Sequence, residues 1–295
     1  MSTRIKTIEL FLALGVATAV GVPGVPVNAQ NADEVLDEPN ADLLLVAQGG
    51  EGGEGGEGGE GGEGGEGGEG GEGGEGGEGG EGAVSTGDPE VDYMTVLSLM
   101  KGQLSTAQEL VAAGNYEQAG PLVRQSAEEL YGDIAPTLPE KGVEDFQPTL
   151  TQLHELIQTA PESPEVVSLL DESSTSVENA IAAVPEEQAS SPEFVMDVMV
   201  ETLKKAAAEY QASIASDQFA GTAEYQNAKA FVDRADELYQ TVADEKSQAD
   251  PEGHETISSS LETLKTAVPS VEPPAAPVLE PAQVNGLVSQ IEFSK

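Results

Sequence analysis

The chain has 295 residues and an acidic composition, with 54 Asp and Glu against 12 Lys and Arg and a formal net charge of −42. Such a charge repels nucleic acid and anionic lipid, so we exclude nucleic-acid binding. The chain has no cysteine, which excludes disulfides, thiolate metal sites and cysteine nucleophiles, and its two histidines, His154 and His254, lie far apart in the sequence.

Residues 1–29 are typical of a secretory signal peptide. Arg4 and Lys6 supply the positive start, the run Leu10–Val22 is apolar or small, and residues 27–29 offer the modest side chains that a signal peptidase reads. The apolar run is shorter than the roughly 20 residues that a spanning helix needs, which favours cleavage over a retained membrane anchor. We therefore expect a periplasmic or secreted protein, with no membrane insertion after signal cleavage.

Residues 30–82 show no pattern typical of a folded segment. Residues 30–48 form an acidic lead-in linker with one apolar patch, Leu43–Val46; the alternative to a plain linker is a docking strand or transient helix. Residues 49–82 repeat Gly-Gly-Glu and contain eleven glutamates. Because glycine loses much backbone entropy on ordering and the like charges repel, we predict a disordered tether. Single glutamates on such a chain would bind divalent cations only weakly.

The following residues predict an all-α fold, a bundle of about eight helices. We place the helical domain at residues 83–268, and a proline-rich linker with a short C-terminal helix at residues 269–295. Four helix starts carry a cap residue followed by proline, namely Asp88-Pro89, Ser163-Pro164, Ser191-Pro192 and Asp250-Pro251. Apolar residues recur every three or four positions, as expected for helices with one buried face. In the first helix this stripe consists of Val91, Met94, Leu97, Met100, Leu104 and Val111.

Residue types also predict where several of these helices end. The first helix ends at Gly114-Asn115, and the second reaches Ile134, with Pro121 marking either its start or a kink. The fifth helix extends to Ile214. No stretch alternates with the two-residue period for long enough to predict a strand.

The helices can be divided into two halves, at about 88–185 and 191–268, related by an internal duplication. Asn115-Tyr116-Glu117-Gln118-Ala119 is similar to Glu224-Tyr225-Gln226-Asn227-Ala228. Further on, Glu129-Leu130-Tyr131 matches Glu237-Leu238-Tyr239 with a one-residue shift. The alternative is chance similarity among helices rich in Ala, Glu and Tyr.

No catalytic signature is present in the sequence. It contains no phosphate-binding loop, dinucleotide fingerprint, nucleophile elbow or helix with paired metal-ligand histidines. We therefore predict that the protein is not an enzyme and has no cofactor.

Carboxylates and tyrosines are the candidate metal ligands. Glu128 and Glu129 lie beside Tyr131, and Glu209-Tyr210 faces Glu224-Tyr225 across one predicted helical hairpin. Oxygen ligands of this kind suit calcium, manganese or iron. The alternative, which we favour, is a solvated helix face with packed tyrosine rings, so the metal ligands stay unknown.

The remaining candidate ligands are better explained by surface or core positions. His154-Glu155 is expected on the surface. The methionines of the apolar stripes are expected in the core rather than at a copper site; these are Met94, Met100, Met196 and Met199.

Two segments resemble an uncharacterised family of secreted bacterial all-helical proteins, namely residues 93–104 (YMTVLSLMKGQL) and 128–131 (EELY). In that family a histidine follows the Lys-Gly pair, and a His-Pro pair precedes the acidic segment. This chain has Gln103 at the first position and Gln125-Ser126 at the second. A metal-binding role of those histidines is therefore not carried over to this chain.

The second half, from Glu209-Tyr210 to Phe231, is similar to the extracytoplasmic helical segment attached to some bacterial iron permeases. The two resemblances together cover residues 92–245. The resemblance to the iron permease segment implies an association with metal handling. The signal-like start, the tether and the lack of a catalytic motif predict a non-enzymatic helical binding or accessory protein outside the cytoplasm, whose partner is an envelope protein or cations. The alternative is an acidic structural or colloidal envelope protein with no specific ligand.

Overall fold

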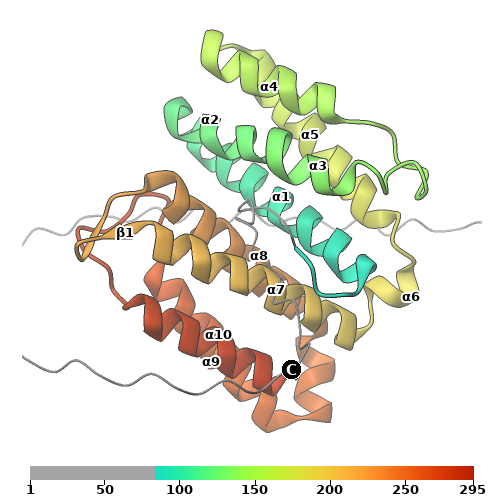
Figure 1. Ribbon diagram of the computed structural model, residues 1–295, viewed down its shortest axis with the longest axis vertical. Coiled ribbons are helices and arrows are strands. Elements are labelled where there is room, and N and C mark those ends of the chain that lie inside the picture. The colour runs from blue at the N-terminus through green and yellow to red at the C-terminus, as the bar shows by residue number, and fades with distance from the viewer. Residues whose placement is uncertain (1–83) are drawn as a thin grey trace, which may run out of the picture. The chain divides into compact units, whose positions relative to one another are not determined.

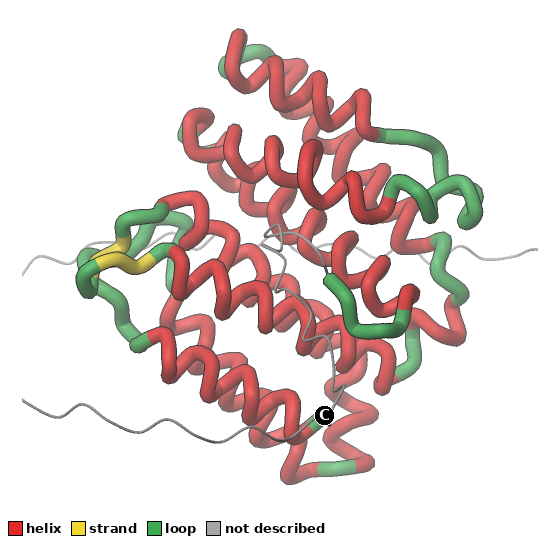
Figure 2. The backbone as a smooth tube through the Cα atoms, in the orientation of Figure 1, coloured by secondary structure: helices red, strands yellow, loops and turns green. Residues whose placement is uncertain are grey.

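The computed structural model describes residues 84–295, so the expected signal peptide, lead-in linker and tether lie outside the described residues. Residues 84–295 are predominantly helical, which confirms the predicted all-α fold (Figure 1; Figure 2). Apart from the second predicted helix, which is described below, the long helices are α1 (Pro89–Ala112), α4 (Gln147–Thr159), α5 (Pro164–Ala182), α7 (Pro192–Ala212), α8 (Thr222–Ala249), α9 (Pro251–Ala267) and α10 (Pro281–Ser294). The short helix α6 (Glu186–Ala189) is a single turn.

The helix starts follow from the cap residues. α1, α5, α7 and α9 each begin at the proline that follows the predicted cap. The carboxylate of Asp88 accepts hydrogen bonds from the backbone N–H groups of Glu90 and Val91, and that of Asp250 accepts one from Gly253. These bonds satisfy N–H groups that have no partner inside the helix, so local chemistry determines where the helices begin.

The second predicted helix is continuous but irregular. It consists of α2 (Tyr116–Gln125), the π-helical turn η1 (Ser126–Leu130) and α3 (Tyr131–Ile134). Pro121 lies inside α2 and does not mark its start. A π turn holds one more residue than the α-helical turn it replaces. This extra residue accounts for the one-residue shift between the two similar sequence segments.

A two-stranded hairpin interrupts the helical pattern between α7 and α8 (Figure 2). The strands β1 (Ile214–Ala215) and β2 (Gln218–Phe219) pair antiparallel. Ser216 and Asp217 both have positive φ, as the two central residues of a tight hairpin turn of this kind require. The fifth helix, expected to extend into this hairpin, ends earlier, at Ala212.

The helices form two four-helix groups with the same neighbour relations (Figure 1). In the first bundle, α1 contacts α2 and α5, and α4 contacts α2 and α5. In the second bundle, α7 contacts α8 and α10, and α9 contacts α8 and α10. The last helix, expected as a separate segment beyond the linker, thus packs within the second bundle. The duplication itself stays a prediction.

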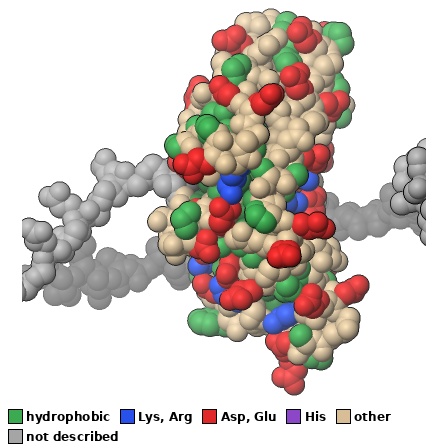
Figure 3. All heavy atoms as spheres, turned by 90° about the vertical axis from the view of Figure 1, so that its right-hand side faces the viewer, with side chains coloured by type: hydrophobic (Ala, Val, Ile, Leu, Met, Phe, Trp, Pro, Cys, Tyr) green, Lys and Arg blue, Asp and Glu red, His purple; other side chains and the backbone are tan. Residues whose placement is uncertain are grey.

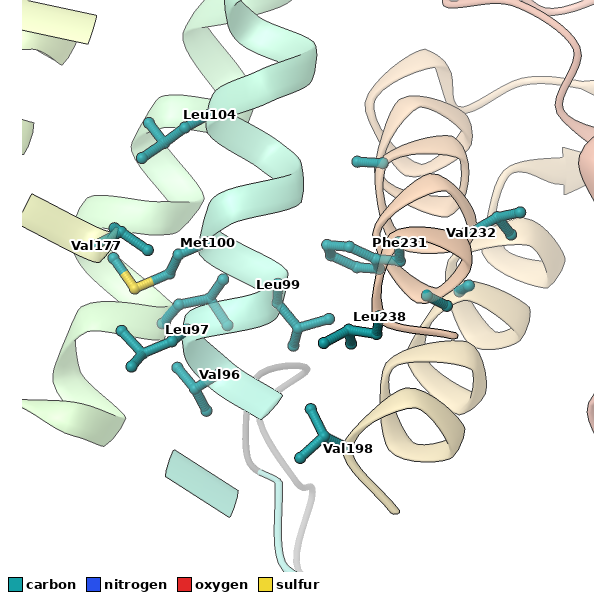
Figure 4. Packing of buried hydrophobic residues seen from close by; sticks show 14 of the residues in the cluster. Val96, Leu97, Leu99, Met100, Leu104, Val177, Val198, Phe231, Val232 and Leu238 are labelled. Carbon is teal, nitrogen blue, oxygen red and sulfur yellow. The ribbon is translucent and has the colours of Figure 1, made fainter. Parts of the chain in front are cut away.

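α1 lies between the two bundles and is buried on several faces, whereas the sequence predicted one buried face. Besides the other helices of the first bundle, it contacts α7 and α8 of the second. Leu97 and Met100 point to the side of Val177, while Leu99 points toward Leu238 on α8 (Figure 4). The one-face expectation fails because an amphipathic stripe reveals contact with one neighbour, and α1 has neighbours on both sides.

On the face shown in Figure 3, acidic side chains are widely spread, with few Lys and Arg between them. Several of the basic side chains pair with them; Lys141, for example, lies 2.7 Å from a carboxylate oxygen of Glu90. Among residues 84–295, no helix has both the length and the apolar character that crossing a membrane requires.

Candidate functional site at the junction of the two bundles

A group of amide and hydroxyl side chains fills the junction between the bundles. Gln103 on α1 is fully buried, and its Nε2 donates to Oε1 of Gln125 at 2.6 Å and to Oδ1 of Asn227 on α8 at 3.1 Å. The hydroxyl of Ser126 donates to Oε1 of Gln103 at 2.6 Å. One glutamine therefore joins α1 to both bundles through its donor and acceptor atoms.

Asn227 extends this group to α7. Its Nδ2 donates to Oε1 of Gln125 at 2.7 Å and to Oε1 of Glu209 at 3.3 Å. We call Gln103, Gln125, Ser126, Asn227 and Glu209 the junction cluster. It contains one carboxylate among neutral groups, and its fully buried members are hydrogen-bonded, as buried polar groups require. Ser126 also begins the π turn, and such turns are frequent at functional sites.

The connection between α9 and α10, which we call the strap (residues 268–280), lies against the second bundle. The hydroxyl of Tyr225 donates to the carbonyl of Ser270 at 2.9 Å, and that of Tyr210 donates to the carbonyl of Leu279 at 2.7 Å. The ring of Phe219 makes edge-to-face contacts with both tyrosines. Two of the three tyrosines predicted as candidate ligands, Tyr210 and Tyr225, thus hold the two ends of the strap.

The strap also contacts the first bundle. Glu272 accepts hydrogen bonds from Asn115 at 3.3 Å and from Gln118 at 3.2 Å, both at the start of α2. Nε2 of the fully buried Gln226 donates to Oε1 of Gln118 at 2.6 Å and to the carbonyl of Val271 at 3.2 Å. The strap and a second amide pair therefore link the two bundles beside the junction cluster.

The first predicted group of carboxylates lies around a basic side chain and does not converge with Tyr131. Glu128 and Glu129 pair with Arg124, at 3.2 and 3.5 Å. The hydroxyl of Tyr131 donates instead to Asp145, at 2.5 Å. These contacts agree with the favoured alternative of a solvated helix face.

The carboxylates of the second predicted pair have different neighbours. Glu209 contacts Asn227, whereas the side chain of Glu224 lies over Gly221 at the start of its own helix. Within residues 84–295, no three His, Asp or Glu side chains are grouped in a way that could hold a metal ion.

The histidines and methionines occupy structural positions. Nε2 of His154 lies 2.7 Å from Nε2 of Gln158, and Nδ1 of His254 lies 2.7 Å from the hydroxyl of Tyr239. The four methionines singled out in the sequence are buried in the core; they are Met94, Met100, Met196 and Met199.

Burial controls the ionisation of the tyrosines. Burial is the largest cause that raises the pKa of Tyr131 to about 12, and its hydrogen bond to Asp145 adds to the shift. The same hydrogen bond lowers the pKa of Asp145. Burial also raises the pKa of Tyr225 to about 12. These phenols therefore remain protonated donors at neutral pH.

Sequence reasoning found Gln103 and Gln125-Ser126 only as positions that differ from the resembling family. In the structure Gln103 is hydrogen-bonded to both Gln125 and Ser126, and Gln103 and Gln125 are hydrogen-bonded to Asn227. The sequence did contain a sign of their role, because each of these polar residues interrupts an apolar helical pattern and needs a hydrogen-bond partner when buried. The sequence did not show which partner each would find.

The comparisons concern the second bundle. Residues 185–294 match the family model of the iron permease-associated 4-helix bundle domain. This range contains α7, α8, α9 and α10, which form the second bundle, and confirms the similarity inferred from the second half of the sequence. A search of curated proteins and a search of solved structures each found no match.

Proposed function

We propose that this chain is a non-enzymatic accessory protein that works outside the cytoplasm beside an iron transport system. Its ligand in this proposal is a partner protein of that system. The match of residues 185–294 to the iron permease-associated 4-helix bundle domain carries the proposal. The signal-like residues 1–29 support the extracytoplasmic location, and the lack of a catalytic motif in the sequence supports a non-enzymatic role.

The chemistry of the junction cluster does not suit an iron ion. Its donors are amides, one hydroxyl and the carboxylate of Glu209, and they are hydrogen-bonded to one another. Iron sites in helical bundles use several carboxylates with histidine. The junction cluster does not fit that requirement, so iron enters the proposal as the cargo of the partner.

Iron uptake by the host cell tests the accessory role. Deletion of the gene should lower uptake of labelled iron and leave manganese uptake unchanged, and the intact gene should restore it. Fractionation of the same cells should recover the chain outside the cytoplasm. Unchanged iron uptake, or recovery in the cytoplasm, would contradict the proposal.

Direct metal binding needs a separate measurement. Calorimetry and native mass spectrometry of the full chain with iron, manganese, copper and calcium should show no saturable binding tighter than millimolar. Saturable, tighter binding would replace the partner protein with a metal as the ligand.

The net charge of −42 favours one further candidate, an acidic structural or colloidal envelope protein with no specific ligand. In that case stability should rise steeply with added salt, because screening relieves repulsion between the carboxylates. A melting temperature that does not respond to salt would count against this candidate.

A further inference from the structure

Tyr116 and Tyr225 stand at matching sequence positions near the starts of α2 and α8, but only Tyr225 is covered. Tyr225 is fully buried, the ring centroid of Phe219 lies 4.8 Å from its own, and its hydroxyl donates to the strap carbonyl of Ser270. Tyr116 is only half-buried, and its hydroxyl has no hydrogen-bond partner among residues 84–295. The start of α2 therefore presents a free phenolic donor at the position where the second bundle binds its strap.

The difference between the two tyrosines follows from the connections between the helices. In the second bundle, the hairpin between α7 and α8 carries Phe219, and the strap joins α9 to α10. The corresponding connections of the first bundle are residues 113–115 and 160–163, which contain neither a hairpin nor a strap. The surface beside Tyr116 therefore lacks the cover that the second bundle has.

Two adjoining grooves of about 410 and 230 Å³ lie at Tyr116, where the start of α2 meets the end of α4 and the start of α5 (Figure 1). Their lining is mainly apolar, and Pro161 belongs to both. His154 lines the larger one and contacts Gln158, and Val167, which is 50% exposed, lines the smaller one. We call the two together the Tyr116 groove. A bound segment would remove its apolar surface from water, which favours binding.

The charged groups of the Tyr116 groove are mainly acidic. Glu117 and Glu162 are exposed there and have no ion-pair or hydrogen-bond partner among residues 84–295. Arg124 also lines the groove, but its guanidinium is already paired with carboxylates of its own helix. A segment that carries Lys or Arg therefore complements the groove, whereas an acidic segment is repelled.

The same charge argues against a second copy of this chain as the occupant. Each copy has a formal net charge of −42, so two copies repel each other. The strap of a second copy would also bring the carboxylates of Glu272 and Glu280 toward Glu117 and Glu162. A different protein with a basic segment fits the groove better.

The strap shows how a helical bundle of this kind binds an extended segment. Its prolines keep it extended, and the hydroxyls of Tyr225 and Tyr210 donate to its backbone carbonyls at Ser270 and Leu279. Recognition through backbone carbonyls tolerates differences in side chains. A segment with another sequence can therefore bind to a tyrosine hydroxyl in the same way.

We propose that the Tyr116 groove binds an extended segment of another protein that carries apolar side chains together with Lys or Arg. The hydroxyl of Tyr116 donates to a backbone carbonyl of this segment. Its apolar side chains cover Val167, and its basic side chains pair with Glu117 and Glu162. The assignment of this protein to an iron transport system rests on the function proposed above, whereas the preference of the groove for such a segment does not.

A synthetic peptide tests the groove directly on the full-length chain. The peptide has the sequence of strap residues 270–280 with Glu272→Lys and Glu280→Lys, and it carries a fluorophore at its N-terminus. Fluorescence anisotropy should show saturable binding that is about fivefold tighter than that of the peptide with the native glutamates, the effect of two exposed ion pairs. Equal affinities, or no saturable binding up to about 1 mM, would overturn the proposal.

Variants of the chain test the individual contacts. Tyr116→Phe should lower the affinity for the lysine peptide about fivefold, the usual effect of one hydrogen bond, with unchanged helicity by circular dichroism. Glu117→Gln with Glu162→Gln should remove the preference for the lysine peptide. Tyr225→Phe is the matched control and should leave the affinity unchanged, because other contacts still hold the strap in place. An equal loss of affinity in Tyr225→Phe would assign the peptide to the site of the strap and overturn the proposal.

Iron uptake tests the identity of the partner. In cells that lack the gene, a copy with Val167→Asp should not restore uptake, because its carboxylate would be covered beside Glu162 without a partner. Val278→Asp, at a similarly exposed valine of the strap, is the control and should restore uptake. A wild-type copy that restores nothing would contradict only the proposed function, since the peptide decides the groove. Full restoration by Val167→Asp would overturn the assignment of the transport partner to the groove.

Discussion

Gln103 on α1 and Asn227 on α8 are hydrogen-bonded across the junction of the two bundles, with 3.1 Å between Nε2 and Oδ1. The same Nε2 also donates to Gln125, so a single side chain connects α1, α2 and α8. Because both residues are buried, the loss of this contact would leave polar atoms without water or protein partners. The alignment of the two bundles therefore depends on the junction cluster.

Replacing Gln103 tests this dependence. Gln103→Leu retains most of the volume but leaves atoms of Ser126 and Asn227 unpaired, so we expect a loss of about 1–3 kcal/mol in the free energy of unfolding. Gln240→Leu, the same change at an exposed position of α8, should change it by less than about 0.5 kcal/mol. Urea denaturation measures both, and equal effects would show that the junction cluster has no special weight.

Gly102 permits a close approach of α1 to α8. A Cβ atom at this position would lie 2.8 Å from the backbone oxygen of Ala230. We expect Gly102→Ala to destabilise the protein by about 1–3 kcal/mol, because backbone atoms cannot move aside easily. Gly132→Ala on α3, where nothing lies within 4 Å of the new atom, should instead stabilise by up to about 1 kcal/mol. Thermal denaturation in which Gly102→Ala is neutral would contradict this packing.

The tyrosines predict a loss of stability at high pH. Burial is the main cause that raises the pKa of Tyr93, Tyr131 and Tyr225 to about 12 in the folded protein. The unfolded chain releases these protons near pH 10, so their contribution to stability is complete below pH 10 and is lost as the pH rises through 12. Because the chain lacks tryptophan, phenolate absorbance reports this directly. These three phenols should titrate near 12 when folded and near 10 in urea; titration near 10 in both would refute the burial.

The strap should loosen when its tyrosine contacts are removed. Tyr225→Phe deletes the hydrogen bond to Ser270 and keeps the ring against Phe219. One hydrogen bond contributes about 1 kcal/mol, so amides in residues 270–272 should exchange about fivefold faster with deuterium. Tyr239→Phe, which affects a contact with His254 instead, is the control. Unchanged exchange in Tyr225→Phe would mean that packing alone holds the strap.

The similarity between the two halves could be read from the sequence, but its irregularity could not be explained there. The one-residue shift between the segments at Tyr131 and Tyr239 corresponds to the π turn Ser126–Leu130. A π turn forms only where the packing of the surrounding helices accommodates its hydrogen-bonding pattern, and no residue type predicts it reliably. In the sequence, the extra residue is visible only as a one-residue shift in the alignment of the two halves.

The candidate site, too, could be predicted from the sequence only in part. The sequence offers Tyr210 and Tyr225 as candidate metal ligands beside carboxylates, with packed rings and solvated hydroxyls as the favoured alternative. Their partners are carbonyls of the strap, and backbone atoms carry no sequence signature. The carboxylates Glu209 and Glu224 point to different partners, since a helical spacing does not specify side-chain direction across a hairpin.

The sequence by itself determined the helices, because caps such as Asp88-Pro89 and Asp250-Pro251 and the three- and four-residue apolar spacing act within one helix. It also determined the acidity and the absence of cysteine chemistry. Only the tertiary structure decided that α1 is buried between two bundles and that Gln103, Gln125 and Asn227 meet there. Caps and apolar spacing depend on residues that are neighbours along the chain. The partners of buried polar groups depend instead on which helices the packing brings within about 3 Å of each other.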